Sequence, residues 1–248
     1  MSIISSFSKP ANIVIFGASG GIGNAIVEAL AMDERAGNVI ALSRTPPDFD
    51  SPKVTSLPVD IMDEASVAAI AGQCADAGPI DLVIVATGIL HDGKRLRPEK
   101  RMQDLDAEAM AEVFRINTIA PAIIAKHFLP LMRRDEKTAF AAISARVGSI
   151  GDNRLGGWAS YRASKAALNM LIRTLSIEHA RTHQAGVVAA LHPGTTDTAL
   201  SKPFQRNVPE GKLFSPEFTA ACLLRVLNEL TSNESGGFFA WNGDPIEF

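Results

Sequence analysis

The sequence contains one tyrosine, Tyr161, and a lysine follows it four residues later at Lys165. If this stretch is helical, the two side chains leave one face of the helix as neighbours. A free phenol titrates near pH ~10 and is a poor acid or base at neutral pH. A fixed ammonium beside it favours the phenolate and brings that pKa toward the range that acid–base catalysis uses. The pair indicates a Tyr–Lys catalytic site, although a helix with this spacing also arises by chance.

A glycine-rich turn follows the first apolar run, residues 12–16, which is typical of a strand buried on both faces of a parallel sheet. Such a turn brings backbone N–H groups and a helix N-terminus together, an arrangement that suits the diphosphate of a dinucleotide. Its glycine spacing differs from the GxGxxG pattern. A tight turn that only needs positive φ is the alternative. The turn reads Gly17-Ala18-Ser19-Gly20-Gly21-Ile22-Gly23.

The rest of the chain alternates apolar strands with helical patterns, and no Gly-, Ser- or Pro-rich linker divides it. Alternation of this kind predicts right-handed crossovers and a parallel sheet covered on both faces. We expect one α/β domain over residues 1–248, a Rossmann-type doubly wound parallel sheet of about seven strands flanked by helices. Strands are predicted at residues 12–16, 39–42, 54–59, 81–86, 140–143, 187–191 and 238–241. Helices are predicted at residues 24–32, 64–75, 106–132 (with a kink or boundary at Pro121), 159–182 and 216–230.

Composition narrows the class of protein. A net charge of -3 gives no electrostatic footprint for nucleic acid. Cys74 and Cys222 are far apart and have no histidine cluster beside them, so neither a disulfide nor a metal site is expected. The N-terminus lacks the basic region of a secretory signal, and no uncharged apolar run reaches the ~18 residues that span a bilayer. We expect a cytoplasmic protein without a membrane partner.

With the glycine turn and the Tyr161/Lys165 pair in place, the chain resembles the short-chain dehydrogenase/reductase family from about Asn12 to Trp241. Within the family it is most similar to the C-factor/sniffer-like subgroup. The stretches GSIGDNRLGGWASYRASKAALNM and ALHPGTTDTALSKPF carry this closer similarity. The resemblance implies hydride transfer between a nicotinamide and a carbonyl or alcohol substrate, an apolar substrate lid at residues 199–212, and a homodimer or homotetramer built on the helices at 106–132 and 159–182.

The resemblance also implies a role for each matching residue. Tyr161 would donate the proton, Lys165 would hold the ribose and lower the tyrosine pKa, Ser144 would orient the carbonyl, and Asn117 would support a water beside Lys165. Asp60 would contact adenine, and Pro193-Gly194 would pass the nicotinamide. The cofactor-binding residues expected in total are Gly17, Ser19, Gly20, Gly21, Ile22, Gly23, Ser43, Arg44, Asp60, Ile61, Ala86, Thr87, Gly88, Tyr161, Lys165, Pro193, Gly194, Thr196 and Thr198.

Two positions depart from the family pattern. The stretch Ala86-Thr87-Gly88 lacks the usual asparagine, and Thr87 is the residue that could partly replace it. The stretch Ile143-Ser144-Ala145 has alanine where the family commonly has its catalytic serine. Adjacent strand residues point to opposite faces, so Ser144 serves only if the strand end twists or bulges. Ser149 is the alternative, and a site without any serine is a third.

Charge at the end of the second strand indicates the cofactor. NAD-preferring Rossmann proteins place an acid there, whereas this strand ends in Ser43-Arg44. A guanidinium can hold a 2′-phosphate with two hydrogen bonds, and a hydroxyl can add another. NADP(H) is favoured and NAD(H) stays possible, because Arg44 could also be simply solvated.

Several features leave the function open. The basic run Lys94–Arg101 is either a solvated loop or a site for an anionic substrate or partner. His91 and His192 adjoin motif stretches and either face the pocket or serve in packing. We expect an NADP(H)-dependent carbonyl reductase or alcohol dehydrogenase acting on a small molecule. The alternatives are a dinucleotide-binding signalling protein with little turnover, and an epimerase or dehydratase on the same fold.

Overall fold

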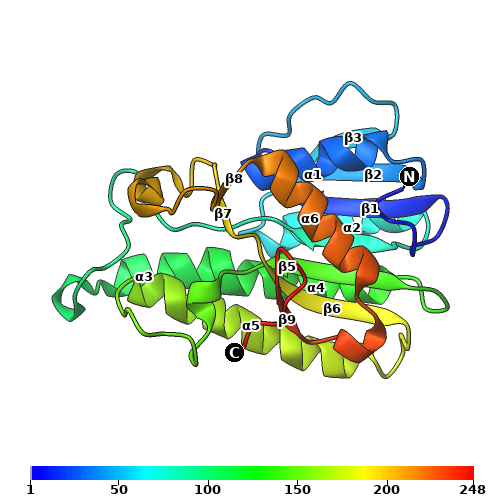
Figure 1. The fold of residues 1–248 in the computed structure, drawn as a ribbon. Helices are drawn as coiled ribbons and strands as arrows, with labels where there is room; N and C mark the ends of the chain where they lie inside the picture. The colour runs from blue at the N-terminus through cyan, green and yellow to red at the C-terminus, as the bar shows by residue number, and fades with distance from the viewer. Residues whose placement is uncertain (1) are drawn as a thin grey trace.

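The computed structural model describes residues 2–248, so Met1 of the expected domain 1–248 lies outside the described residues. Seven parallel strands form one sheet in the order β3-β2-β1-β4-β5-β6-β9, with helices on both faces (Figure 1). This confirms the expected doubly wound α/β fold. The strands are β1 (Ala11–Phe16), β2 (Ala36–Ser43), β3 (Val54–Pro58), β4 (Leu82–Val85), β5 (Thr138–Ile143), β6 (Gly186–His192) and β9 (Phe238–Ala240).

The helices lie where the apolar periodicity places them, with one correction. The single helix expected over residues 106–132 is divided into α3, a π-helical turn at Arg115–Ile119, α4, and a short 3₁₀ turn at Leu129–Leu131. Pro121 is the second residue of α4 and directly follows the π-helical turn, so its missing N–H leaves one hydrogen bond of this continuous helical path unmade. The helices are α1 (Gly21–Met32), α2 (Glu64–Asp76), α3 (Ala107–Phe114), α4 (Ala120–Phe128), α5 (Ala159–His179) and α6 (Pro216–Glu229). None of them, within residues 2–248, is long and apolar enough to cross a membrane.

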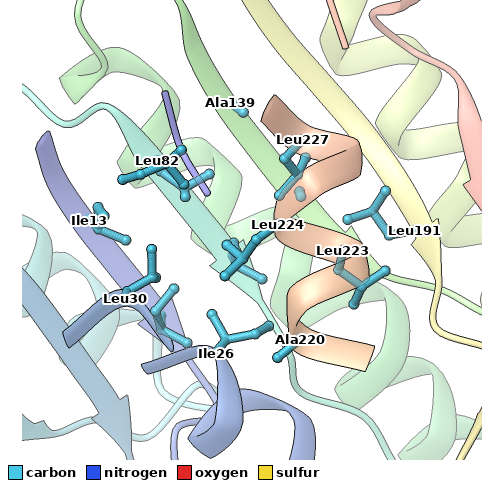
Figure 2. Packing of buried hydrophobic residues seen from close by; sticks show 14 of the residues in the cluster. Ile13, Ile26, Leu30, Leu82, Ala139, Leu191, Ala220, Leu223, Leu224 and Leu227 are labelled. Carbon is cyan, nitrogen blue, oxygen red and sulfur yellow. The ribbon is translucent and has the colours of Figure 1, made fainter. Parts of the chain in front are cut away.

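Two hydrophobic clusters cover the two faces of the sheet. On one face α1 and α6 pack side by side over β1, β4 and β6, with Leu30 and Leu224 among the buried contacts (Figure 2). On the other face α2, α4 and α5 cover the sheet, and the Phe16 and Phe128 rings meet edge to face at 5.1 Å between centroids. Because both faces are buried, the strands read as nearly continuous apolar runs.

The strand order reverses at β1, which lies between β2 and β4. In a doubly wound sheet the ligand crevice forms at this switch point, outside the carboxyl ends of the strands. A small two-stranded sheet, β7 (Thr195–Thr196) with β8 (Leu213–Phe214), stands apart from the main sheet at that edge (Figure 1). The pairing of β7 with β8 holds the two ends of the expected lid together. The sequence pattern did not predict this small sheet. Residues Lys202–Asn207 form a 3₁₀ segment between the two short strands.

Candidate active site

A cavity of about 660 Å³ opens at the carboxyl ends of β1, β4, β5 and β6. The start of α5 and the lid segment close its sides. The expected site residues that line it are Gly20, Gly21, Ile22, Ala86, Thr87, Gly88, Ser144, Tyr161, Lys165, Pro193, Gly194, Thr196 and Thr198. The expected site residues that do not line it are Gly17, Ser19, Gly23, Ser43, Arg44, Asp60, Ile61 and Asn117.

The glycine turn joins β1 to α1 in a form that only glycine fits well. Gly17 has a φ of +86°, and a Cβ on it would stand 2.8 Å from the carbonyl oxygen of Ala86. A Cβ on Gly21 would stand 2.8 Å from Thr198 Cγ2. Gly20 is the N-cap residue of α1 and has no side chain to cap the helix. The first N–H groups of α1 are therefore available to an anion such as a diphosphate.

Tyr161 and Lys165 lie one turn apart on α5, and both are buried. Lys165 Nζ donates a hydrogen bond to the Ile143 carbonyl oxygen at 2.8 Å and lies 5.9 Å from the centroid of the tyrosine ring. Burial raises the pKa of Tyr161 to about 12 and lowers the pKa of Lys165 to about 7. The expectation that Lys165 lowers the tyrosine pKa is therefore wrong for this arrangement, because desolvation of the phenolate outweighs the nearby amine.

Asn117 lies in the π-helical turn and connects the loop after β4 to α5. Its Nδ2 donates to the Ile89 carbonyl oxygen at 2.8 Å and to Ser164 Oγ at 3.2 Å, and its Oδ1 accepts from the Ile89 N–H at 2.8 Å. Ser164 Oγ in turn donates to the Tyr161 carbonyl oxygen at 2.8 Å. Asn117 thus holds the loop after β4, which lines the cavity, against α5. Its role in supporting a water stays a prediction.

Ser144 does not offer its hydroxyl proton to the cavity. Its Oγ donates to Asn169 Oδ1 at 2.7 Å, in the interior against α5. The pairing of β5 with β6 continues in regular register through Ile143, and the Ser144 N–H donates to the Leu191 carbonyl oxygen at 2.7 Å. The twist or bulge that would turn this serine around is absent there. Ser144 and Ala145 both line the cavity, but the Ser144 hydroxyl is engaged by Asn169.

Ser149, the alternative serine, is not among the residues that line the cavity. It is buried beneath the loop, and its Oγ accepts a hydrogen bond from the Asp152 N–H at 3.1 Å. Of the two serines, Ser144 lines the cavity with its hydroxyl donated to Asn169, and Ser149 lies outside the lining. The third possibility, a site without a serine donor, fits this geometry best.

The end of β2 carries the groups expected to select the cofactor. Arg44 is exposed and forms no ion pair with the other residues of 2–248. Ser43 Oγ is buried and has no hydrogen-bond partner in residues 2–248, and the same holds for Thr87 Oγ1 beside the cavity. Buried hydroxyl groups are normally hydrogen-bonded. An unpaired guanidinium and two unpartnered hydroxyls at this edge fit a phosphorylated dinucleotide.

The cavity has an aromatic wall, of which sequence reasoning named His91 and the lid that carries Phe204 but missed Trp158. The Trp158 ring lies 4.9 Å from the Phe204 ring and 6.4 Å from the Tyr161 ring, between centroids. Trp158 has a φ of 54°, the left-handed region that few residues other than glycine adopt. His91 adds to this wall, because its ring lies 5.7 Å from Phe204 and its Nε2 contacts the Leu200 carbonyl oxygen at 3.1 Å. The one feature of the sequence that could have indicated the unusual backbone at Trp158 is the glycine pair that precedes it.

Within the basic run, Glu99 is a second residue that sequence reasoning missed. Its carboxylate is buried and accepts hydrogen bonds from the Ser160 hydroxyl and, at 3.3 Å, from the Ser160 N–H. Its carbonyl oxygen accepts from the Trp158 N–H at 2.6 Å. Glu99 therefore caps the helix that carries Tyr161. Arg95 and Arg101 in the same run form ion pairs with Glu112 and Asp104, which agrees with a solvated loop rather than an anion site.

Comparison with known proteins gives the family. The family model described as short chain dehydrogenase matches residues 11–209. A 1-hydroxy-2-glutathionyl-2-methyl-3-butene dehydrogenase from Rhodococcus sp. (strain AD45) is 31% identical over 239 residues, which are 95% of this chain and 99% of that protein. The C-signal protein of Myxococcus xanthus is 31% identical over 169 residues, which are 68% of this chain and 93% of that protein.

Among solved structures, an NADPH-bound carbonyl reductase from chicken fatty liver is 27% identical and has a TM-score of 0.84. The superposition covers 97% of this chain and 95% of that one. Together with the switch-point cavity, the glycine turn and the buried Tyr161–Lys165 pair, these matches lead to one conclusion. The chain belongs to the short-chain dehydrogenase/reductase family of oxidoreductases, with relatives that include C-signal and carbonyl reductases.

Proposed function

We propose that the protein is an NADP(H)-dependent carbonyl reductase that acts on a small, largely apolar carbonyl compound. The observation that carries this proposal is the buried phenol of Tyr161, one helical turn from Lys165, in the wall of the switch-point cavity. The NADPH-bound carbonyl reductase among the related structures supports the reaction class. Apolar residues of the lid and the Trp158–Phe204 pair support an apolar substrate.

The pKa values of the pair set its protonation state at neutral pH. With a pKa of about 12, Tyr161 is protonated at neutral pH and is ready to donate its proton to a carbonyl oxygen. When bound, the nicotinamide supplies the hydride that the carbonyl carbon accepts. Lys165, with a pKa of about 7, is partly charged at that pH, and its ammonium form favours the phenolate that remains. Solvent protons then restore the phenol.

The proposed cofactor is NADP(H) rather than NAD(H). The first N–H groups of α1 would bind the diphosphate, and Arg44 with Ser43 would bind the 2′-phosphate. Lys165 would hold the ribose, and Asp60, Thr196 and Thr198 stay assigned by the resemblance alone. An acidic side chain at residue 44 would repel the phosphate, and none is present.

Fluorescence titration of the purified protein with NADPH and, separately, NADH tests the cofactor. We expect NADPH to bind at least tenfold more tightly; equal or tighter NADH binding would overturn the assignment. A panel of aldehydes and ketones then tests turnover by the loss of NADPH absorbance. Tyr161→Phe should keep NADPH binding and lose turnover, and a Phe variant with near-normal turnover would refute the mechanism.

A dinucleotide-binding signalling protein is the second candidate. The match to C-signal and the alanine at residue 145 favour it. A protein that binds NADPH tightly but consumes none with any carbonyl compound would support this alternative.

We also propose that the protein acts in the cytoplasm as a homodimer or homotetramer. Ile119, Met170 and Ile177 on or beside α4 and α5 are more than half exposed, which supports an interface through these helices. Size-exclusion chromatography with light scattering would measure how many subunits the assembly contains.

A further inference from the structure

His192 ends β6 at the strand edge where the cavity opens, and it lines that cavity. Its Nδ1 accepts a hydrogen bond from the Arg146 backbone N–H at 3.3 Å. A backbone N–H can only donate, so Nδ1 carries a lone pair and the imidazole proton is on Nε2. The hydrogen bond therefore fixes which ring nitrogen is a donor.

The imidazole is neutral at neutral pH. Burial and, to a smaller extent, the positive charge of Arg146 lower the pKa of His192 to about 4. No atom of residues 2–248 accepts a hydrogen bond from Nε2. The side chain therefore presents one N–H donor that the protein itself leaves unused.

This donor lies next to the position where the site lacks a serine. Arg146, whose N–H holds the ring, directly follows Ala145, and Ala145, His192 and Tyr161 line the same cavity. Two other polar side chains are already engaged. Ser144 Oγ donates to Asn169, and His91 Nε2 contacts the Leu200 carbonyl oxygen.

We propose that His192 is a catalytic residue whose Nε2–H donates a hydrogen bond to the carbonyl oxygen of the substrate, in place of the serine that Ala145 removes. The inference rests on the proposed carbonyl reduction. As hydride reaches the carbonyl carbon, negative charge develops on the oxygen, and a fixed neutral donor stabilises it. His192 keeps its proton throughout, because Tyr161 supplies the one that the oxygen gains.

Kinetics of four variants test this role. His192→Phe keeps a ring but removes the donor, and kcat should fall about 100-fold or more, the loss typical of one oxyanion donor. The NADPH dissociation constant should stay within about threefold, which also shows that the variant folds. His192→Gln, which restores an N–H donor, should recover at least about tenfold of the loss. Ala145→Ser added to His192→Phe should recover a similar part, and His127→Phe on α4 is the matched control.

Nitrogen NMR of the wild-type protein tests the geometry without turnover. At pH 7 the His192 imidazole, assigned with the His192→Gln variant, should be neutral and protonated on Nε2. A ring protonated on Nδ1, or on both nitrogens, would overturn the inference. Two kinetic results would also overturn it. One is a His192→Phe variant whose kcat lies within threefold of the wild-type value. The other is a hundredfold loss of kcat in Ser144→Ala with no loss in His192→Phe. A wild-type protein that consumes no NADPH would instead refute the proposed function and this role with it.

Discussion

Glu99→Ala is the substitution whose effect follows most directly from the structure. It removes the carboxylate that accepts the Ser160 hydroxyl and N–H, at the start of the helix that carries Tyr161. Trp158, the N-cap residue, makes no side-chain cap of its own, so no other group is in place to satisfy these donors. Glu99 forms no ion pair within residues 2–248, so the helix N-terminus is the main compensation for its charge.

The expected loss follows from these contacts. Each buried donor left without a partner costs about 1–2 kcal/mol, so Glu99→Ala should lower the free energy of unfolding by about 2–4 kcal/mol. Glu99→Gln keeps a hydrogen-bond acceptor and removes only the negative charge at the helix N-terminus. We expect this variant to lower the free energy of unfolding by about 1 kcal/mol. Because Tyr161 follows Ser160 directly, kcat should also fall, while NADPH binding, which also uses the glycine turn and Arg44 on other elements, should change less than kcat.

Urea denaturation followed by tryptophan fluorescence measures the first effect, and NADPH consumption measures the second. Glu28→Ala, an exposed residue of α1, is the matched control and should change the free energy of unfolding by less than about 0.5 kcal/mol. If Glu99→Ala were as stable as this control, the buried carboxylate would not be the cap that we infer, and the argument would fail.

Two further perturbations test other parts of the molecule. Arg44→Ala should weaken NADPH binding about 10- to 100-fold, which is the expected cost of losing one charge-assisted hydrogen bond. The affinity for NADH, measured in a paired titration, should not change. Equal weakening of NADPH and NADH binding would refute the contact between Arg44 and the 2′-phosphate. His179 stacks on His183 at 4.0 Å, and burial together with the charge of His183 lowers its pKa to about 4. The unfolded chain binds this proton more readily, so the contribution of His179 to stability should fall by about 3 kcal/mol as pH drops from about 6.5 to about 4, beside a separate loss at His192, whose pKa is also lowered. His179→Leu should flatten that part of the curve in urea titrations; an unchanged slope would contradict the assignment.

Sequence periodicity was enough to predict the fold and the neighbouring positions of Tyr161 and Lys165 on one helix. Strands buried on both faces read as apolar runs, and a tyrosine and a lysine four residues apart on one helix must be neighbours wherever the helix lies. The glycine turn was equally readable, because a tight strand-to-helix turn needs a residue with positive φ, and Gly17 has a φ of +86°. These features depend on residues close together in the chain.

The tertiary structure alone decided how the site is completed. Regular pairing of β5 with β6 turns Ser144 toward Asn169, and the sequence could not say whether the strand end bulges. Burial sets the pKa of Tyr161, and a short-range argument from Lys165 gave the opposite sign. Glu99 reaches α5 from 61 residues away, and His192 is oriented by a backbone N–H 46 residues earlier. Local pattern specifies which elements form, whereas desolvation and hydrogen bonds between distant segments exist only once those elements are packed together.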